Sequence, residues 1–379
     1  MVTAYAGREV PDELKDLEST ISVLELATMG RGIDPATQAG ILRGGFNTAQ
    51  SVKYAADLSL QAFKYYEFLF GPLPFKSVSV TEQPVRGYGQ SWPNLIFLPY
   101  DSLLDATTRN SLRLQESVEA LEFYNIVAVH EMAHQWWGHM VGCKTYHDEW
   151  LTEGIAEFAA GLYLRQFQPK NSNEFWNQKR SWLLSKNRWG FRPVDIGPIW
   201  LNAQLGNYEG FQSAHLLYHK GAYILEMLRS LLYDPKQKNP DNRFILMMRD
   251  FVKTYAGQNA STEDFQKVVE KHFGESMDWF FHEWVYGTAI PSYDFSYQLQ
   301  DIGTGQTDLN ITISQLDVPD AFKMRLPVYA AVQNEIIYLG LIPVEGSLPN
   351  NIRIKLALKP DRVLLDPWHN ILINTIRQQ

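Results

Sequence analysis

Apolar residues recur with a helical period in two segments near the N-terminus. In residues 11–29 they share one face of a predicted helix, at Leu14, Leu17, Ile21 and Leu24. Residues 48–70 predict a second helix, which ends at the turn-forming run Gly71-Pro72-Leu73-Pro74. Residues 75–99 alternate between apolar and polar side chains, which predicts short strands.

A long helical region follows and then gives way to strands. Residues 112–287 are almost wholly helical by period, apart from an irregular stretch at 189–207. Ser261, followed by Glu263 and Asp264, is typical of a helix N-terminus with an acidic first turn. Beyond Ile290, short alternating or β-branched runs are separated by turn residues, and about 85 residues of this pattern predict a small β-sandwich.

Composition narrows the class of protein further. The length of 379 residues suggests two or three domains, and a net charge of -8 without a basic stripe argues against nucleic-acid binding. A stretch of about twenty apolar residues is lacking, so we expect no membrane span. Residues 1–11 lack the apolar core of a signal peptide. Cys143 is the single cysteine, which excludes an internal disulfide but leaves the compartment open.

The most informative pattern is the pentad His130-Glu131-Met132-Ala133-His134. Residues 119–129 run into it without Pro or Gly, so we expect one continuous helix. Two histidines four positions apart lie on one helix face and can bind a single metal ion, a pattern typical of zinc metalloproteases. The alternative is a buried helix whose histidines are satisfied by hydrogen bonds.

A second helical pattern starts near Glu149 and carries Glu153, which lies eighteen residues beyond the pentad. Gly138 and Gly142 allow the chain to leave the first helix in between, so the two helices can converge on one ion. A third protein ligand leaves the fourth position for water, the arrangement of a catalytic zinc. The predicted ligands of one Zn²⁺ ion are therefore His130, His134 and Glu153.

Glu131 is the expected general base. It cannot easily bind the same ion as its flanking histidines, but it can take a proton from water and pass it to the leaving amine. Zinc lowers the pKa of bound water to about 7, which makes hydroxide available at neutral pH. Asp148 and Glu157 either orient the ligands or are solvated surface acids. We interpret Cys143 as partly buried and outside the ligand set.

The pentad with the following Gln-Trp-Trp-Gly, the eighteen-residue gap and the run Trp150-Leu151-Thr152-Glu153-Gly154 resemble the aminopeptidase N family of gluzincins, which includes leukotriene hydrolase. Residues 217–228 resemble the family segment that presents a catalytic tyrosine, and the matching position is Tyr218. Judged without that segment, Tyr218 fits a core tyrosine better. The resemblance runs from about residue 60 to the end of the chain.

This resemblance implies an α+β fold and a division of the chain. Residues 1–47 would be an N-terminal helical or linking segment, 48–290 a thermolysin-like, mostly helical zinc catalytic domain with a small mixed sheet, and 291–379 an all-β sandwich. It also implies peptide or protein substrates. Tyr218, with an ordinary pKa of about 10, would stay protonated and donate a hydrogen bond to the oxyanion. The oligomeric state is not indicated.

The chain departs from the family at the Gly-Ala-Met-Glu-Asn strand, whose glutamate binds the free amino group of the substrate. Residues 94–99 match the run that follows this motif, which places the glutamate position at Ser91; counted from Gly87, it is Gln90. Neither residue is acidic, and losing a charge-assisted contact should weaken capture of a free N-terminus by about 2–3 kcal/mol. Glu82, which lies upstream on the same predicted strand, is a candidate to compensate.

Three hypotheses remain open. The chain is a zinc aminopeptidase with an altered amine anchor, an endopeptidase or a peptidase for blocked or modified peptides, or a peptide-binding module that keeps zinc with little turnover. The complete set of ligands, base and tyrosine argues against the third.

A second departure lies at the start of the chain. Relatives usually have a large N-terminal β domain, and a strand-rich region is missing before about residue 60. We expect either an unusually open cleft or a soluble or extracytoplasmic part excised from a longer protein, which leaves the localisation undetermined.

Overall fold

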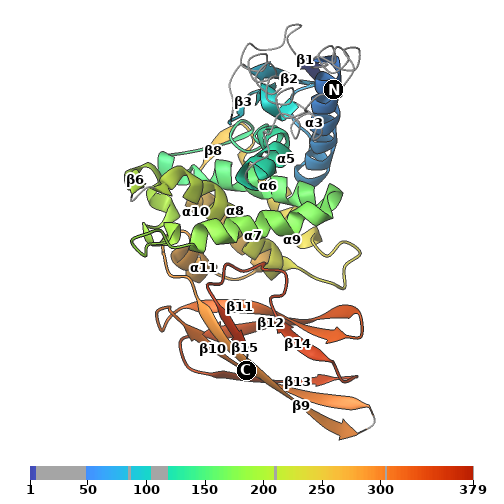
Figure 1. The fold of residues 1–379 in the computed structure, drawn as a ribbon, viewed down its shortest axis with the longest axis vertical. Helices are drawn as coiled ribbons and strands as arrows, with labels where there is room; N and C mark the ends of the chain where they lie inside the picture. The colour runs from blue at the N-terminus through green and yellow to red at the C-terminus, as the bar shows by residue number, and fades with distance from the viewer. Residues whose placement is uncertain (6–47, 84–86, 104–117, 209–210, 304, 379) are drawn as a thin grey trace, which may run out of the picture. The chain divides into compact units, whose positions relative to one another are not determined.

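The computed structural model describes residues 1–5, 48–83, 87–103, 118–208, 211–303 and 305–378 (Figure 1). The helix expected at residues 11–29 lies outside these ranges. The chain forms two compact units, Met1–His139 and Met140–Gln379. The domain boundaries expected at 47/48 and 290/291 stay predictions.

The first unit contains a four-stranded sheet in the order β1-β2-β4-β3. Strands β1 (Val2–Tyr5), β2 (Val78–Gln83) and β4 (Leu95–Pro99) are parallel, while β3 (Gln90–Trp92) runs antiparallel to β4 at the edge. The strands expected within residues 75–99 are confirmed. Strand β1 falls in a segment for which only helix or linker was expected, because four residues are too few to show a period.

Helix α3 (Thr48–Phe70) confirms the prediction for residues 48–70, and it packs against α5 (Val118–Ala133). The packing continues past the end of α5 at Trp136. The centroid of the Trp136 ring lies 6.0 Å from that of Phe63 and 6.1 Å from that of Tyr66. The Trp136 indole N–H also donates to the carbonyl of Gly71 at 2.8 Å. Gly71 ends α3 at a φ of 98°, which glycine adopts without strain.

The N-terminal part of the second unit is mostly helical, as the sequence period predicts. Short β5 (Val141–Cys143) pairs in parallel with β8 (Gln258–Ala260), and the irregular stretch holds the 3₁₀ turns η3 (Pro193–Asp195) and η4 (Ile199–Leu205). Ser261 accepts a hydrogen bond from the Asp264 N–H, which confirms the predicted N-terminus of α10. The helices are α6 (Trp150–Phe167), α7 (Pro169–Leu184), α8 (Ser213–Leu232), α9 (Asn242–Tyr255), α10 (Thr262–Phe273) and α11 (Asp278–Trp284).

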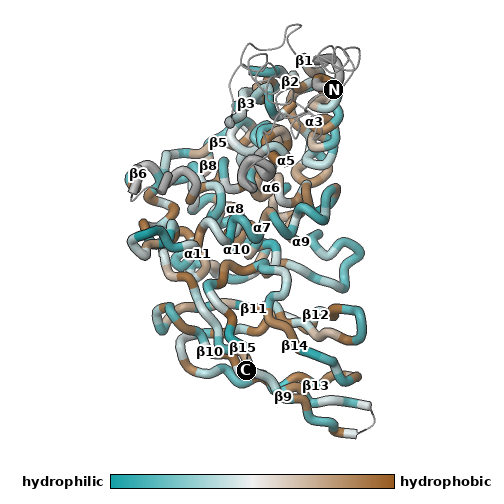
Figure 2. Tube along the Cα trace, in the orientation of Figure 1, coloured by the Kyte–Doolittle hydropathy of each residue, from teal (hydrophilic) through white to brown (hydrophobic). Residues whose placement is uncertain are grey.

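The C-terminal part of this unit is all strand, as expected. Its two sheets have the orders β13-β10-β9-β15 and β12-β11-β14. Alternate residues of β10, Leu309, Ile311 and Ile313, are buried, and the strands accordingly show mixed brown and teal segments in Figure 2. The bounds are β9 (Ser292–Gly303), β10 (Gln306–Leu316), β11 (Lys323–Val332), β12 (Glu335–Glu345), β13 (Asn350–Leu356), β14 (Arg362–Leu365) and β15 (Ile376–Gln378).

Buried and half-buried charged side chains join the helices and strands of the second unit. The Arg180 guanidinium on α7 donates to the carbonyl of Ile373 at 2.8 Å, just before β15. Glu226 on α8 lies between the guanidiniums of Arg165 at 2.7 Å and Arg229 at 2.6 Å. Burial alone would raise the pKa of Glu226, but these two cations reverse the shift and hold it below the ordinary value. Glu226 therefore stays ionised, and its ion pair with Arg165 holds α6 against α8.

The described helices include none with the length and apolar character that a bilayer crossing requires.

Candidate active site

Helix α5 carries the histidine pentad at its C-terminal end. It is apolar on nearly all sides in its last three turns, and Val129, Met132 and Ala133 are fully buried. His130 and Glu131 are buried as well, while His134 directly follows the helix and is half-buried. Gly138 then takes a φ of 112°, which lets the chain turn away after Trp137.

The two imidazoles face each other across one helical turn. Their Nε2 atoms are 3.1 Å apart, and His134 Nδ1 lies 2.9 Å from the carbonyl oxygen of Trp137. A carbonyl oxygen only accepts, so Nδ1 of His134 carries the proton and Nε2 presents its lone pair in the neutral form. A tetrahedral zinc with bonds of about 2.0–2.1 Å holds two nitrogens about 3.3 Å apart, close to the observed spacing.

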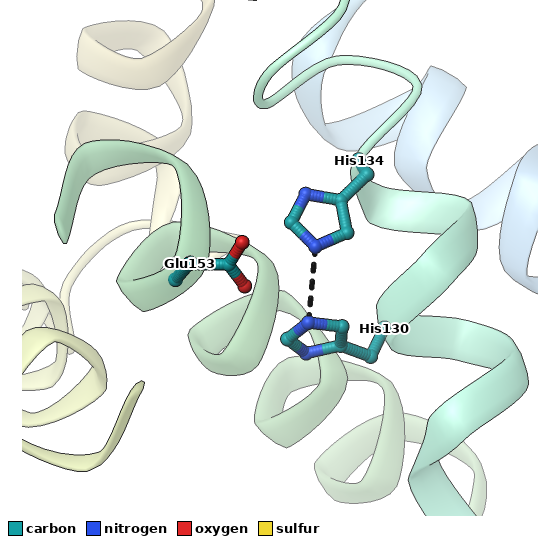
Figure 3. Close-up of side chains that lie close together, drawn as sticks. All are labelled: His130, His134 and Glu153. Carbon is teal, nitrogen blue, oxygen red and sulfur yellow. Dashed lines mark hydrogen bonds between the residues drawn. The ribbon is translucent and has the colours of Figure 1, made fainter. Parts of the chain in front are cut away.

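Glu153 completes the predicted ligand set. One ligand atom from each of His130, His134 and Glu153 lies within 4.8 Å of the others, the one such group among the described residues. Figure 3 shows the Glu153 carboxylate directed toward the two imidazoles. Two nitrogens and one oxygen suit zinc, and three protein ligands leave the fourth position of a tetrahedron for water. The donor set therefore fits a catalytic zinc.

The start of α6 is held by Asp148. This buried carboxylate accepts from the Thr145 hydroxyl at 2.8 Å and from the backbone N–H of Thr262 at 2.7 Å and its hydroxyl at 2.9 Å. The Trp150 indole N–H donates to the Thr262 hydroxyl at 3.1 Å. The interpretation of Asp148 as a solvated surface acid is therefore wrong. Its contacts with residues 114 positions away could not be seen in a local pattern.

Glu157 is likewise not a surface acid. It is buried and forms an ion pair with Lys179 of α7, whose Nζ also lies 3.4 Å from Nδ1 of His219. The pair joins α6 to α7, and its lysine approaches the residue that follows Tyr218 on α8. Sequence reasoning missed Lys179, because a lysine in an amphipathic helix normally faces solvent.

Helices α6 and α8 cross where Gly154 and Gly221 bring their backbones into contact. A Cβ on Gly154 would lie 2.7 Å from Cα of Gly221 and 3.3 Å from the carbonyl oxygen of Leu217. Neither position has room for a side chain, because the obstructing atoms belong to the backbone. Gly154 directly follows Glu153, and Leu217 directly precedes Tyr218, which is half-buried. The crossing therefore brings the backbones next to Glu153 and Tyr218 close together.

The carboxylate of Glu131 lies against the chain segment that leads into β3. A Cβ on Gly89 would be 2.6 Å from Oε1 of Glu131, so the backbone passes directly beside this carboxylate. Glu131 is not part of the metal-ligand group, which is consistent with its predicted role as a base. Sequence reasoning missed Gly89, because a glycine between predicted strands is ordinarily interpreted as a turn residue.

The structure separates the two candidates for the altered amine anchor. Ser91 pairs with Ile96 of β4, and its Oγ accepts a hydrogen bond from Gln135 at 2.8 Å, so Ser91 faces the pentad segment. Gln90 is exposed on the opposite face, as side chains alternate along a strand. Glu82 lies on β2, which β4 separates from β3, so the expectation that it shares the edge strand is wrong.

Cys143 lies on β5 and remains outside the metal-ligand group of the described residues. Burial and the nearby Glu149 carboxylate raise the pKa of its thiol, which disfavours the thiolate that a metal ligand requires.

The chain is similar in sequence and in fold to known proteins. Residues 91–284 match the Peptidase family M1 domain. The mitochondrial aminopeptidase 2 of Saccharomyces cerevisiae is 24% identical over 295 residues, covering 75% of this chain and 28% of that protein. A probable aminopeptidase 2 of Sulfurisphaera tokodaii is 25% identical over 296 residues, covering 76% of this chain and 33% of that protein.

The fold is also found in a solved structure. Aminopeptidase A of Legionella pneumophila, crystallised with aspartic acid, superposes with a TM-score of 0.64 at 15% identity over 88% of this chain and 35% of that one. The family match spans half of the chain, and the chain belongs to peptidase family M1. It spans 28% and 33% of the length of the two aminopeptidases above. The predicted family and the mixed helical and β-sandwich fold are confirmed.

Proposed function

We propose that this chain hydrolyses peptide bonds with one zinc ion held by His130, His134 and Glu153, and that it recognises a free amino terminus only weakly. The observation that carries this proposal is the group of three ligand atoms within 4.8 Å, together with the His134 Nε2 lone pair set by its Nδ1 contact. The names of the relatives support peptide substrates.

The chain supplies the proton transfers and part of the oxyanion stabilisation. When bound, zinc would polarise the scissile carbonyl and lower the pKa of a bound water. Glu131, outside the ligand set, takes the proton of the attacking water and returns it to the leaving amine. Tyr218 donates its phenolic proton in a hydrogen bond to the oxygen on which negative charge develops.

Metal removal tests the proposal most directly. We expect chelation to abolish peptide hydrolysis and added Zn²⁺ to restore it, because the attacking water is not acidic enough without the ion. His134→Ala should lose the bound zinc, measured by inductively coupled plasma mass spectrometry. His282→Ala, at an exposed position on α11, is the control that should keep it. Hydrolysis that continues unchanged after chelation would refute the proposal.

The second candidate function is cleavage of blocked or internal peptide bonds, and the neutral Ser91 favours it. The Ser91 hydroxyl faces the pentad segment but carries no charge to attract an ammonium group. Binding through the backbone of an edge strand does not require a free N-terminus. The residue at position 91 therefore decides between hydrolysis at a free N-terminus and cleavage of blocked or internal peptide bonds.

Ser91→Glu tests that choice. A carboxylate at this position would attract the substrate ammonium, so we expect kcat/KM for free peptides relative to N-acetylated peptides to rise about tenfold to a hundredfold. Gln90→Glu is the matched control, since it adds the same charge one residue away on the exposed face. A ratio that changes equally in both variants would show that Ser91 is not the anchor position.

A further inference from the structure

The amide of Gln135 joins the pentad segment to the edge strand β3. The side chain is fully buried, and its Nε2 donates to the Ser91 hydroxyl at 2.8 Å and to the Trp92 carbonyl at 3.0 Å. Its Oε1 accepts from the backbone N–H of Asn94 at 2.8 Å. A backbone N–H only donates and a carbonyl only accepts, so these contacts fix the orientation of the amide.

The segment that contains β3 also contacts α5 at its N-terminal end. Gly89, just before β3, lies against the Glu131 carboxylate, so a Cβ there would be 2.6 Å from Oε1. Glu131 lies near the end of α5, and Gln135 follows four residues later in the turn after this helix. Residues 89–94 are thus held at both ends by the segment that carries the proposed general base and two proposed zinc ligands.

Strand β3 lies at the edge of the sheet among the described strands, with β4 on one side. An extended peptide can add to such an edge through backbone hydrogen bonds. Sliding such a peptide by one residue changes which peptide bond lies beside Glu131 and turns every side chain to the other face. The position of β3 relative to Glu131 therefore decides where a bound peptide is cut.

We propose that Gln135 is a positioning residue that sets the register in which an extended peptide substrate pairs with β3. The proposal rests on the peptide-hydrolysing function argued above. Gln135 itself does not touch the substrate; it acts through Ser91, Trp92 and Asn94. Without its three hydrogen bonds, β3 loses its attachment to the pentad segment, and the bound peptide is no longer held at one position.

Peptide binding by a variant that cannot hydrolyse the peptide tests this directly. In a Glu131→Gln background, we expect Gln135→Leu to weaken binding of an N-acetylated hexapeptide about tenfold or more by isothermal titration calorimetry. Gln135→Glu keeps the acceptor for Asn94 but loses both donated bonds, so it should weaken binding too. It serves as the test if Gln135→Leu does not fold. Unchanged affinity in the folded variant overturns the proposal, as does a Glu131→Gln parent that binds no peptide.

Gln315 on β10 provides a matched control. It too is fully buried, donates to the carbonyls of Phe322 at 3.0 Å and Gly346 at 3.1 Å, and accepts from the Tyr293 hydroxyl at 3.1 Å. Gln315→Leu also loses three hydrogen bonds, two donated and one accepted, within the β-sandwich. We expect it to lower the unfolding temperature without changing peptide affinity. An equal loss of affinity in Gln315→Leu would assign the effect to stability and overturn the proposal.

The cleavage sites chosen by the active enzyme are a second measurement, and a purely structural role of Gln135 would leave them unchanged. Gln135→Leu with Glu131 intact should spread cleavage over neighbouring bonds of the hexapeptide, measured by mass spectrometry of the products. Single-residue amide substrates, too short to pair with β3, should keep their kcat. A single cleavage site in the variant contradicts the proposal. If the unaltered enzyme with zinc cleaves nothing, the proposed function fails, whereas the calorimetric result still decides the role of Gln135.

Discussion

Replacing Glu131 with glutamine is expected to lower kcat for peptide hydrolysis by about three orders of magnitude while zinc stays bound. Glutamine has nearly the same shape, so it fits beside Gly89 where the space next to the carboxylate is tight. It cannot accept a proton from water at neutral pH, which removes the general base. The zinc content should be unchanged, because Glu131 is not in the ligand group. Steady-state kinetics and metal analysis of the same preparation measure both quantities.

Glu174→Gln on α7 is the matched control, because it removes one carboxylate from an exposed helical position. It should keep full activity. A Glu131→Gln variant that keeps more than a tenth of the activity would mean that another group takes the proton. Loss of zinc would mean that Glu131 is a ligand. Peptide binding by an unaltered chain that shows no zinc-dependent turnover would instead favour the hypothesis of a binding module.

The proposed metal ligands could be found from the sequence because their geometry is mostly local. A spacing of four residues on a helix places His130 and His134 one turn apart, and the observed Nε2 separation of 3.1 Å agrees. The third ligand, Glu153, required only that a second helix follow a short connection. Such features depend on period and on turn residues, which a single sequence displays.

Contacts between residues far apart in the sequence could not be predicted from local patterns. Asp148 is buried because Thr262 lies against it, and Glu157 because Lys179 pairs with it; both partners come from other helices. Whether Ser91 or Gln90 faces the pentad segment depends on the register of β3 against β4, and a shift of one residue exchanges the two faces. Sequence alone left that register undecided.

Helix α5 and the turn after it combine two functions on neighbouring faces. His130 and His134 face the proposed metal position, while Glu131 and Gln135 contact the segment that contains β3. A displacement of this helix would therefore move two of the three proposed metal ligands, the proposed base and the segment that contains β3 together.

The proposed oxyanion donor can be tested separately from the base and the metal. Tyr218→Phe removes only the phenolic oxygen, so we expect kcat to fall by about two to three orders of magnitude with KM and zinc content little changed. Tyr223→Phe, on the same helix, is the control: its hydroxyl donates to the Trp176 carbonyl at 3.0 Å in the core, so its loss should reduce stability and leave kcat unaltered. The crossing at Gly154 and Gly221 places the backbone beside Tyr218 against the helix that carries Glu153, which is why the tyrosine is expected to act at the metal site. If zinc is lost in Tyr218→Phe, or if kcat falls equally in both variants, the tyrosine supports the structure of α8 and another group stabilises the oxyanion.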